Sequence, residues 1–225
     1  MKILIDDKIQ AYAPEQIAQW TAELPEWRRE QVLAYKHDLG QRQSLLAYRL
    51  LCQGLREEYG ITEPPTFTYG EHGKPYIPTL SPALSHYGEG VISKVVDTQV
   101  PPPSRGEVGR RVHFSLSHCK EAVACVIDNQ PCGIDIESVN RRASESLIHY
   151  AMNEEEQELI QRQQASGEQE GKRTFIRLWT QKEAVLKLIG TGIRDDMKDV
   201  LTKDEYNITT QETELWVMSV ATCKP

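Results

Sequence analysis

The sequence predicts an α+β protein, and three observations support this fold class. Apolar residues recur at helical spacing between residues 25 and 59 and again between residues 172 and 190. Short runs rich in β-branched residues lie between residues 112 and 137, separated by turn residues. Strand patterns also open and close the chain, in "MKILI" and "LWVMSVAT". The order is strand, helices, strands, then strands, helices, strand, which is compatible with two comparable halves.

In the N-terminal part, the periodicity of residues 25–59 predicts two helices that break near Gly40. "PPTFTYGEHGKPYIP" is typical of short strands joined by Gly and Pro turns. Residues 79–110, rich in Pro and Gly, have the composition of a long loop or insertion. We therefore expect an N-terminal half over residues 1–110 and a C-terminal half over residues 111–225.

In the C-terminal part, "VHFSLS", "AVACVID" and "CGIDIE" predict an antiparallel meander with "GIDIE" as its last strand. Asn153 followed three residues later by Glu156 predicts a helix that starts with a capping box. "KRTFIRLWTQKEAVLKLIG" predicts the strongest helix of the chain, with Gly190 as its stop.

Composition narrows the function. No run approaches the roughly 18 apolar residues of a membrane span, and acids stand where a signal peptide has its apolar centre, so we expect a cytoplasmic protein. A net charge of -7 disfavours nucleic acid as the main partner. The five cysteines form no CxxC pair, which favours buried reduced thiols over disulfides or a zinc site.

"GIDIE" places Asp135 and Glu137 on the same side of a predicted strand. Two carboxylates 4–5 Å apart repel by roughly 4 kcal/mol at the effective dielectric near a protein surface. Either they share a proton or they hold a cation, unless one of them points into solvent at the end of the strand.

The helix at residues 172–190 carries Trp179, Glu183 and Lys187 at successive i+4 positions. An ordinary surface ion pair between the last two is the plain interpretation. The helix is apolar around most of its circumference, however, so a charged pair on it favours a function. If Glu183 faces the two acids of "GIDIE", their oxygens would suit Mg²⁺, and Lys187 would neutralise a phosphate oxygen.

Two further motifs are weaker. Ser117 and His118 end a strand at a turn, but adjacent strand residues face opposite ways, so they are not a nucleophile and its base. "GKP", which contains Lys74, lacks the frame of a phosphate-binding Walker loop. An exposed histidine and a simple turn with an exposed lysine are the plain alternatives.

Taken together, "GKP", "FSLSH", "GIDIE" and "LWTQKEAVLK" closely resemble the 4′-phosphopantetheinyl transferases of the Sfp type. The resemblance spans roughly residues 25–193, and its last two motifs are the specific ones. It implies a monomer built as a pseudo-twofold pair of α+β halves, with coenzyme A and Mg²⁺ between them. Residues 83–97 look like a second, weaker copy of the Leu-Ser-His motif around Ser85 and His86, but Ser117 and His118 run directly into "GIDIE" and are preferred.

The resemblance also implies roles for individual residues. Three acids would hold Mg²⁺ on the pyrophosphate of coenzyme A, namely Asp135, Glu137 and Glu183. Five residues would contact the phosphates or the nucleotide of coenzyme A, namely Arg42, Lys74, Ser117, His118 and Lys187. Because the chain is acidic, as carrier proteins typically are, we expect docking to use apolar contacts and a few arginines, such as Arg28, Arg29, Arg49, Arg141 or Arg142.

The implied reaction is attack by a serine hydroxyl of an apo acyl or peptidyl carrier protein on the β-phosphate of coenzyme A, which releases adenosine 3′,5′-bisphosphate. Charge neutralisation and in-line positioning should dominate it. Glu183 and Lys187 are the candidate catalytic residues, with Glu183 as ligand, base or both. The alternatives are a metal-dependent phosphohydrolase and an inactive module that binds carrier proteins.

Overall fold

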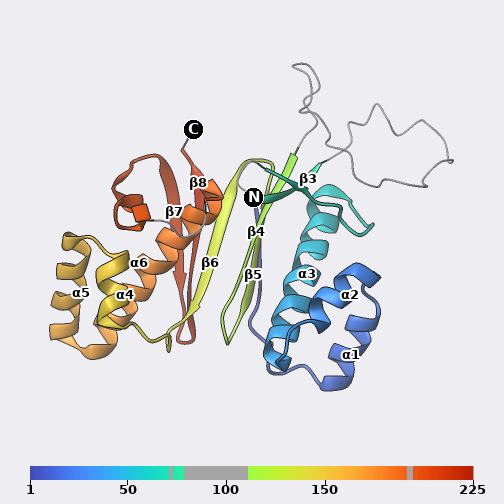
Figure 1. The fold of residues 1–225 in the computed structure, drawn as a ribbon, viewed down its shortest axis with the longest axis horizontal. Coiled ribbons are helices and arrows are strands. Elements are labelled where there is room, and N and C mark those ends of the chain that lie inside the picture. Colours follow the sequence, from blue (N-terminus) through green and yellow to red (C-terminus); the bar gives the residue numbers. More distant parts are fainter. Residues whose placement is uncertain (71–72, 79–110, 192–194, 225) are drawn as a thin grey trace, which may run out of the picture.

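The computed structural model describes residues 1–70, 73–78, 111–191 and 195–224. Two antiparallel sheets lie in the middle of the molecule, and helices cover their outer sides (Figure 1). The mixture of helices and antiparallel strands confirms the predicted α+β class. Residues 79–110, with Ser85 and His86, lie outside the described residues.

The first sheet has five strands in the order β1-β5-β4-β3-β2. In chain order these are β1 (Lys2–Asp6), β2 (Thr68–Tyr69), β3 (Pro75–Pro78), β4 (Arg111–His118) and β5 (Val123–Asp128). Three helices accompany it, namely α1 (Pro14–Ala22), α2 (Glu26–Leu33) and α3 (Asp38–Tyr59). This sheet and its helices form what we call the N-terminal half.

The second sheet has three strands in the order β6-β8-β7. They are β6 (Cys132–Ser138), β7 (Tyr206–Glu212) and β8 (Trp216–Cys223). Three α-helices and a 3-10 helix (Asp195–Thr202) accompany it, the former being α4 (Glu145–Ala151), α5 (Glu154–Ser166) and α6 (Glu168–Ile189). This assembly is the C-terminal half.

Apolar side chains are buried in three main layers. Leu51 and Leu55 of α3 pack with Ile127 of β5 in the N-terminal half, and Phe175 and Ile176 of α6 belong to the core of the C-terminal half. The third layer lies between the two sheets and includes Ala124, Val126, Ile134, Ile136, Met218 and Val220. The two halves are therefore held together by an apolar layer of sheet against sheet.

The strand pairing corrects the predicted meander. β4 and β5 pair as expected, but β6 pairs with β8, with Asp135 opposite Ser219, and not with β5. The other edge of β5 pairs with β1. All of β1 takes part, from Lys2 opposite Ile127 to Asp6 opposite Val123. A partner more than a hundred residues away along the chain has thus displaced the local one. The two sheets divide the chain between β5 and β6, and the domain boundary at residue 110 stays a prediction.

The helices follow the predicted pattern with one correction. Gly40 lies in the first turn of α3, and the break between α2 and α3 falls at residues 34–37. A Cβ on Gly40 would meet the Tyr35 ring at 2.9 Å, so this glycine allows a close contact instead of ending a helix. The predicted end of α6 is confirmed, because Gly190 caps it in the left-handed conformation with φ 84°. The capping box at Asn153 and Glu156 is also present.

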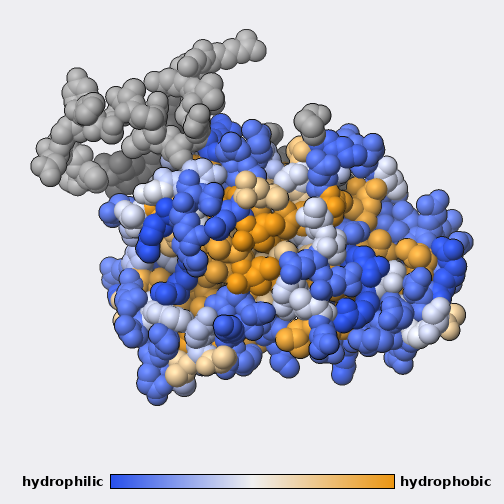
Figure 2. All heavy atoms as spheres, turned by 180° about the vertical axis from the view of Figure 1, so that it is seen from behind, coloured by the Kyte–Doolittle hydropathy of each residue, from blue (hydrophilic) through white to orange (hydrophobic). Residues whose placement is uncertain are grey.

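The surface is mostly hydrophilic. Figure 2 shows hydrophobic residues gathered near the middle of one face, with hydrophilic residues around them. No helix within the described ranges is both long and apolar enough to cross a membrane.

Candidate active site

β6 presents its two acids toward α6. Side chains alternate along a strand, and Ile134 and Ile136 point into the layer between the sheets, so Asp135 and Glu137 point to the other face. Gly133 shares that face, where an added Cβ would lie 2.0 Å from the Ala184 carbonyl oxygen of α6. The strand and the helix therefore approach closely beside the acids, and only glycine permits this spacing.

Asp135 is 5% exposed and lies at the centre of a polar network. Its Oδ1 accepts hydrogen bonds from Ser117 Oγ at 2.8 Å and from Lys187 Nζ at 2.7 Å. Lys187 Nζ also donates to Ser117 Oγ at 3.0 Å. In the part of the chain that the structure describes, the buried Oδ2 of Asp135 has no hydrogen-bond partner. One of its two oxygens is thus satisfied, and the other is left for a ligand.

Glu183 lies on α6 in the same surroundings and is 9% exposed. Its pKa is raised, mainly by burial and then by the negative charge of Asp135, while Lys187 and Arg141 act in the opposite direction. Its buried Oε1 likewise has no partner among the described residues. Two buried carboxylates with an open oxygen each thus lie within one another's electrostatic field.

Glu137 has a different environment. Its Oε1 forms an ion pair with Nη1 of Arg141. The Arg141 guanidinium also lies over the Trp179 ring, 4.3 Å from the ring centroid. No group of three or more His, Cys, Asp or Glu side chains among the described residues is placed to hold a metal ion. The structure therefore brings Asp135 and Glu183 into one site, while Glu137 faces an arginine. The ligand roles of all three acids stay a prediction.

The donors nevertheless suit Mg²⁺ chemically. Mg²⁺ prefers carboxylate oxygens and is commonly bound by one or two of them, with waters and phosphate oxygens completing the shell. The open oxygens of Asp135 and Glu183 satisfy that requirement. Two unpaired carboxylate oxygens in a buried site are otherwise unfavourable, which favours a cation as the missing partner.

The predicted nucleotide-binding residues in β4 also join the two halves. β6 is an edge strand, and its Ile134 and Ile136 N–H groups donate to Ser115 Oγ and Ser117 Oγ, each at 3.2 Å. Ser117 therefore serves β6 and Asp135 together. Ser115 was missed by the sequence analysis, although its two-residue spacing from Ser117 could have indicated a shared face.

Lys74 of "GKP" also lies where the two halves meet, along the line of contact that we call the seam. Its Nζ donates to the Cys132 carbonyl oxygen at 2.6 Å and to the Leu188 carbonyl oxygen at 3.2 Å. Burial lowers the pKa of this amine. The exposed lysine of a simple turn is thus excluded, because the side chain is half-buried and bound to the start of β6 and the end of α6.

The remaining predicted residues differ in their distance from the acids. His118 lies at the exposed end of β4, and its pKa is lowered first by partial burial of the ring and then by the charge of Lys187. Arg42 is buried, and it contacts Asp38 and the carbonyl oxygens of Ile9 and Tyr12 in the N-terminal half. His118 therefore borders the acidic site, whereas the contacts of Arg42 are internal to its own half.

A second buried charge in the C-terminal half escaped the sequence analysis. Lys182 is fully buried, and its Nζ contacts Glu156 Oε2 at 2.7 Å and two carbonyl oxygens of the 3-10 helix at 2.9 Å. Lys182 adjoins Glu183 in the sequence but points to the other side of α6, toward α5. This ion pair fixes α5 and the 3-10 helix against α6.

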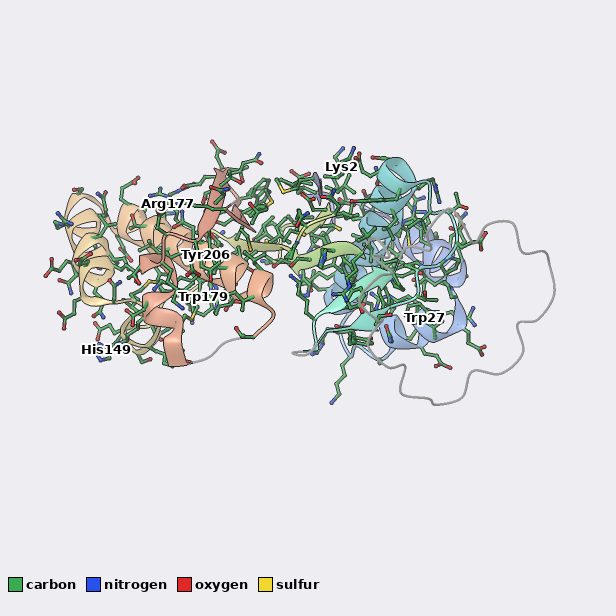
Figure 3. All side chains as sticks on the ribbon, turned by 90° about the horizontal axis from the view of Figure 1, so that it is seen from above. Lys2, Trp27, His149, Arg177, Trp179 and Tyr206 are labelled. Carbon is green, nitrogen blue, oxygen red and sulfur yellow. The ribbon has the colours of Figure 1, made fainter. Side chains whose placement is uncertain are left out.

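The described residues also form a pocket of about 450 Å³ in the N-terminal half. Its walls are largely aromatic and include Trp27, Tyr48, Phe67 and Phe114. Figure 3 shows Trp27 and Trp179 in different halves of the molecule. None of the acids of the candidate site lines this pocket, so it does not bear on their role.

Comparisons with known proteins show what the chain resembles. A profile of the 4′-phosphopantetheinyl transferase superfamily matches residues 131–217, from the start of β6 into β8. A 4′-phosphopantetheinyl transferase of Bacillus subtilis is 24% identical over 186 residues, which cover 81% of this chain and 68% of that protein. Sfp of Bacillus subtilis strain 168 is 26% identical over 167 residues, covering 74% of this chain and 60% of that protein.

A shorter match is more similar. The 4′-phosphopantetheinyl transferase gsp of Aneurinibacillus migulanus is 36% identical over 85 residues, covering 36% of this chain and 33% of that protein. The matches thus span from about a third to about two thirds of the length of these relatives.

The acidic strand β6 and the helix α6 thus lie in the part of the chain, residues 131–217, that resembles the 4′-phosphopantetheinyl transferase superfamily. The resemblance to the Sfp type that the motifs predicted is confirmed.

Proposed function

We propose that this protein transfers the 4′-phosphopantetheine group of coenzyme A to a serine hydroxyl of an apo acyl or peptidyl carrier protein. The observation that carries the proposal is the pair of open, buried oxygens, Asp135 Oδ2 and Glu183 Oε1, beside the ammonium of Lys187. This arrangement suits the recognition of a pyrophosphate together with a divalent cation.

Asp135 and Glu183 would hold Mg²⁺, with Glu137 as a further ligand. When bound, Mg²⁺ would neutralise the pyrophosphate and stabilise the departing phosphate. Lys187 has three N–H groups, of which two contact Ser117 and Asp135, so the third would be available to a phosphate oxygen. Ser117 holds the Asp135 carboxylate in place through its own hydroxyl.

In the reaction, a new bond forms between the carrier serine oxygen and the β-phosphorus, and the bond from that phosphorus to the bridging oxygen breaks. The serine proton passes to Glu183, directly or through water. Burial and the charge of Asp135 raise the pKa of Glu183, which makes its carboxylate a stronger base. The products are the holo carrier protein and adenosine 3′,5′-bisphosphate.

We also propose a binding region for the rest of coenzyme A. Ser117, His118 and Lys74 lie along the seam between the halves, next to the acidic site. They would receive the nucleotide end, with Arg42 reaching the same phosphates from α3. A change in the side chain of Arg42 would be required, since it now contacts backbone carbonyls.

The finer features of the family complete the proposal. We expect a cytoplasmic monomer in which the N-terminal and C-terminal halves are related by a pseudo-twofold axis. Its partners would be coenzyme A and a carrier protein, without nucleic acid or membrane. Exposed arginines such as Arg142 would contribute to carrier docking.

The test is to incubate the protein with Mg²⁺, coenzyme A and an apo carrier protein, and to measure the mass of the carrier. Addition of phosphopantetheine to the carrier serine supports the proposal. Cleavage of coenzyme A with an unmodified carrier would indicate a phosphohydrolase instead. Recovery of both reactants unchanged, from folded protein and with several carriers, would contradict the proposed activity.

A further inference from the structure

Arg141 reaches the acidic site from outside any helix or strand. The chain turns after β6, where the Arg141 N–H donates to the Ser138 carbonyl oxygen at 3.0 Å and the Asn140 N–H donates to Ser138 Oγ at 3.1 Å. This turn returns the Arg141 side chain to the end of β6. Its position is therefore set by backbone hydrogen bonds as well as by its own contacts.

Two contacts hold the guanidinium. It pairs with Glu137 and stacks on the Trp179 ring. The Arg141 and Glu137 side chains are 29% and 18% exposed. Trp179 is only 5% exposed and lies on α6 one turn before Glu183. A planar, permanently charged group is thus fixed between the strand and the helix that carry the acids.

The charge of Arg141 extends to the other two acids. Burial lowers the pKa of Arg141, and the charges of Asp135 and Glu183 oppose that change. Each of the two acids of β6 is paired with a basic side chain, since Lys187 pairs with Asp135 and Arg141 pairs with Glu137. Among the oxygens of these three acids, Asp135 Oδ2 and Glu183 Oε1 are the buried ones that have no hydrogen-bond partner in the described part of the chain.

A divalent cation could therefore bind to Asp135 and Glu183 directly, whereas at Glu137 it would compete with Arg141 for Oε1 and for the charge of the carboxylate. We propose that Arg141 is a positioning residue that competes with a bound cation for the Glu137 carboxylate and holds Glu137 Oε1 away from the cation site. The inference rests on the cation site of the proposed function. It makes Arg141 a determinant of cation affinity.

The test measures Mg²⁺ affinity in the free protein, from the shifts of the β6 backbone amide resonances during a titration. Arg141→Gln should tighten Mg²⁺ binding on the order of tenfold, because it removes a competing charge and frees the Glu137 oxygen. Arg142→Gln is the matched control, since it removes the same charge from the next, exposed residue. It should leave the affinity nearly unchanged. The amide spectrum reports in each case whether the variant is folded.

A double-variant cycle separates competition for Glu137 from a general charge effect. In a Glu137→Gln background, Arg141→Gln should change the affinity much less than it does in the wild-type chain. Equal tightening in both backgrounds would overturn the proposal, as would weaker binding in Arg141→Gln or an equal effect of Arg142→Gln. If Asp135→Asn leaves Mg²⁺ binding intact, the cation site itself is refuted, which is a distinct result.

Discussion

The helices α3 and α6 are alike in form and differ in how their buried charges are used. Each has 22 residues, lies against the sheet of its own half and ends at a glycine in the left-handed conformation. The buried Arg42 of α3 contacts Asp38 and two backbone carbonyl groups. The buried Glu183 of α6 instead keeps an oxygen that has no partner in the described structure. Similar scaffolds thus carry one charge used for internal packing and one left for chemistry.

The largest expected effect is on transfer activity, and it tests this contrast directly. Glu183→Gln and Asp135→Asn should each reduce carrier modification by at least about a hundredfold, because they remove the charge that faces the cation and the pyrophosphate. The mass of the carrier protein measures the effect. Glu214→Gln, an exposed acid before β8, serves as the control. Full activity in either site variant would remove the metal assignment.

Arg42→Met tests whether the buried charge of α3 has a structural role only. If the contacts of Arg42 are structural only, this variant should lower the free energy of unfolding, as measured with urea, and leave transfer by the folded protein intact. A loss of transfer with a higher KM for coenzyme A and unchanged stability would instead give Arg42 the phosphate role that the resemblance implies. The variant thereby decides whether α3 also contributes to the site.

Lys182→Met should cost about 3–5 kcal/mol of unfolding free energy, since it leaves Glu156 as an uncompensated buried charge. Lys2→Met in the N-terminal half is the comparison, because Lys2 pairs with Glu57 at 2.9 Å while both side chains are partly exposed. Its expected cost is small, because solvent screens an exposed ion pair. Urea denaturation of both variants measures the difference, and equal costs would contradict the burial argument. The double variant Lys182→Met/Glu156→Gln, which keeps the side-chain acceptor of the capping box, should recover much of the loss.

Gly133→Ala should destabilise the C-terminal half by about 1–3 kcal/mol, because its Cβ would meet backbone atoms of Ala184 and Leu188 at 2.0 and 2.5 Å. Gly70→Ala is the matched change, since its Cβ would find only the Lys74 carbonyl oxygen at 3.6 Å. Thermal unfolding compares the two. A Gly133→Ala protein as stable as the wild type would show that β6 and α6 can separate without loss.

The smallest expected effect concerns pH. The pKa of His118 in the folded chain lies below its ordinary value of 6.5, because of partial burial and the charge of Lys187, with Asp135 opposing them. Between the two pKa values the unfolded chain binds more protons, so the free energy of unfolding rises with pH across this window and falls as the pH drops through it. His118→Asn should flatten that slope. His149→Asn, at an exposed position in α4, is the control, and an equal slope in all three proteins would contradict the prediction.

The sequence predicted best those features that are local. The strand pattern of "GIDIE", the capping box at Asn153 and the glycine stop of α6 all follow from neighbouring residues, and all are present. The meander failed because the partner of β5 is β1, and no local pattern reports a pairing across more than a hundred residues. Helices α1 and α4 and strand β7 were not predicted, since each is short or weakly periodic.

The candidate site followed the same rule. The sequence analysis made the metal site depend on Glu183 facing the acids of β6, and the structure brings Asp135 and Glu183 together while their roles stay a prediction. The basic side chains that pair with the acids of β6 could not be predicted from these patterns. Lys187 reaches from α6 to Asp135, and Arg141 folds back over the Trp179 ring. Contacts of long side chains depend on tertiary distances, which periodicity does not contain.

The seam at β6 has a consequence for how the molecule adapts. Hydroxyl groups of β4, and not a backbone ladder, satisfy the Ile134 and Ile136 amides. A hydroxyl rotates freely and exchanges readily with water, whereas paired strands lock their register. The two sheets can thus shift slightly relative to each other without breaking the backbone hydrogen bonds within either sheet.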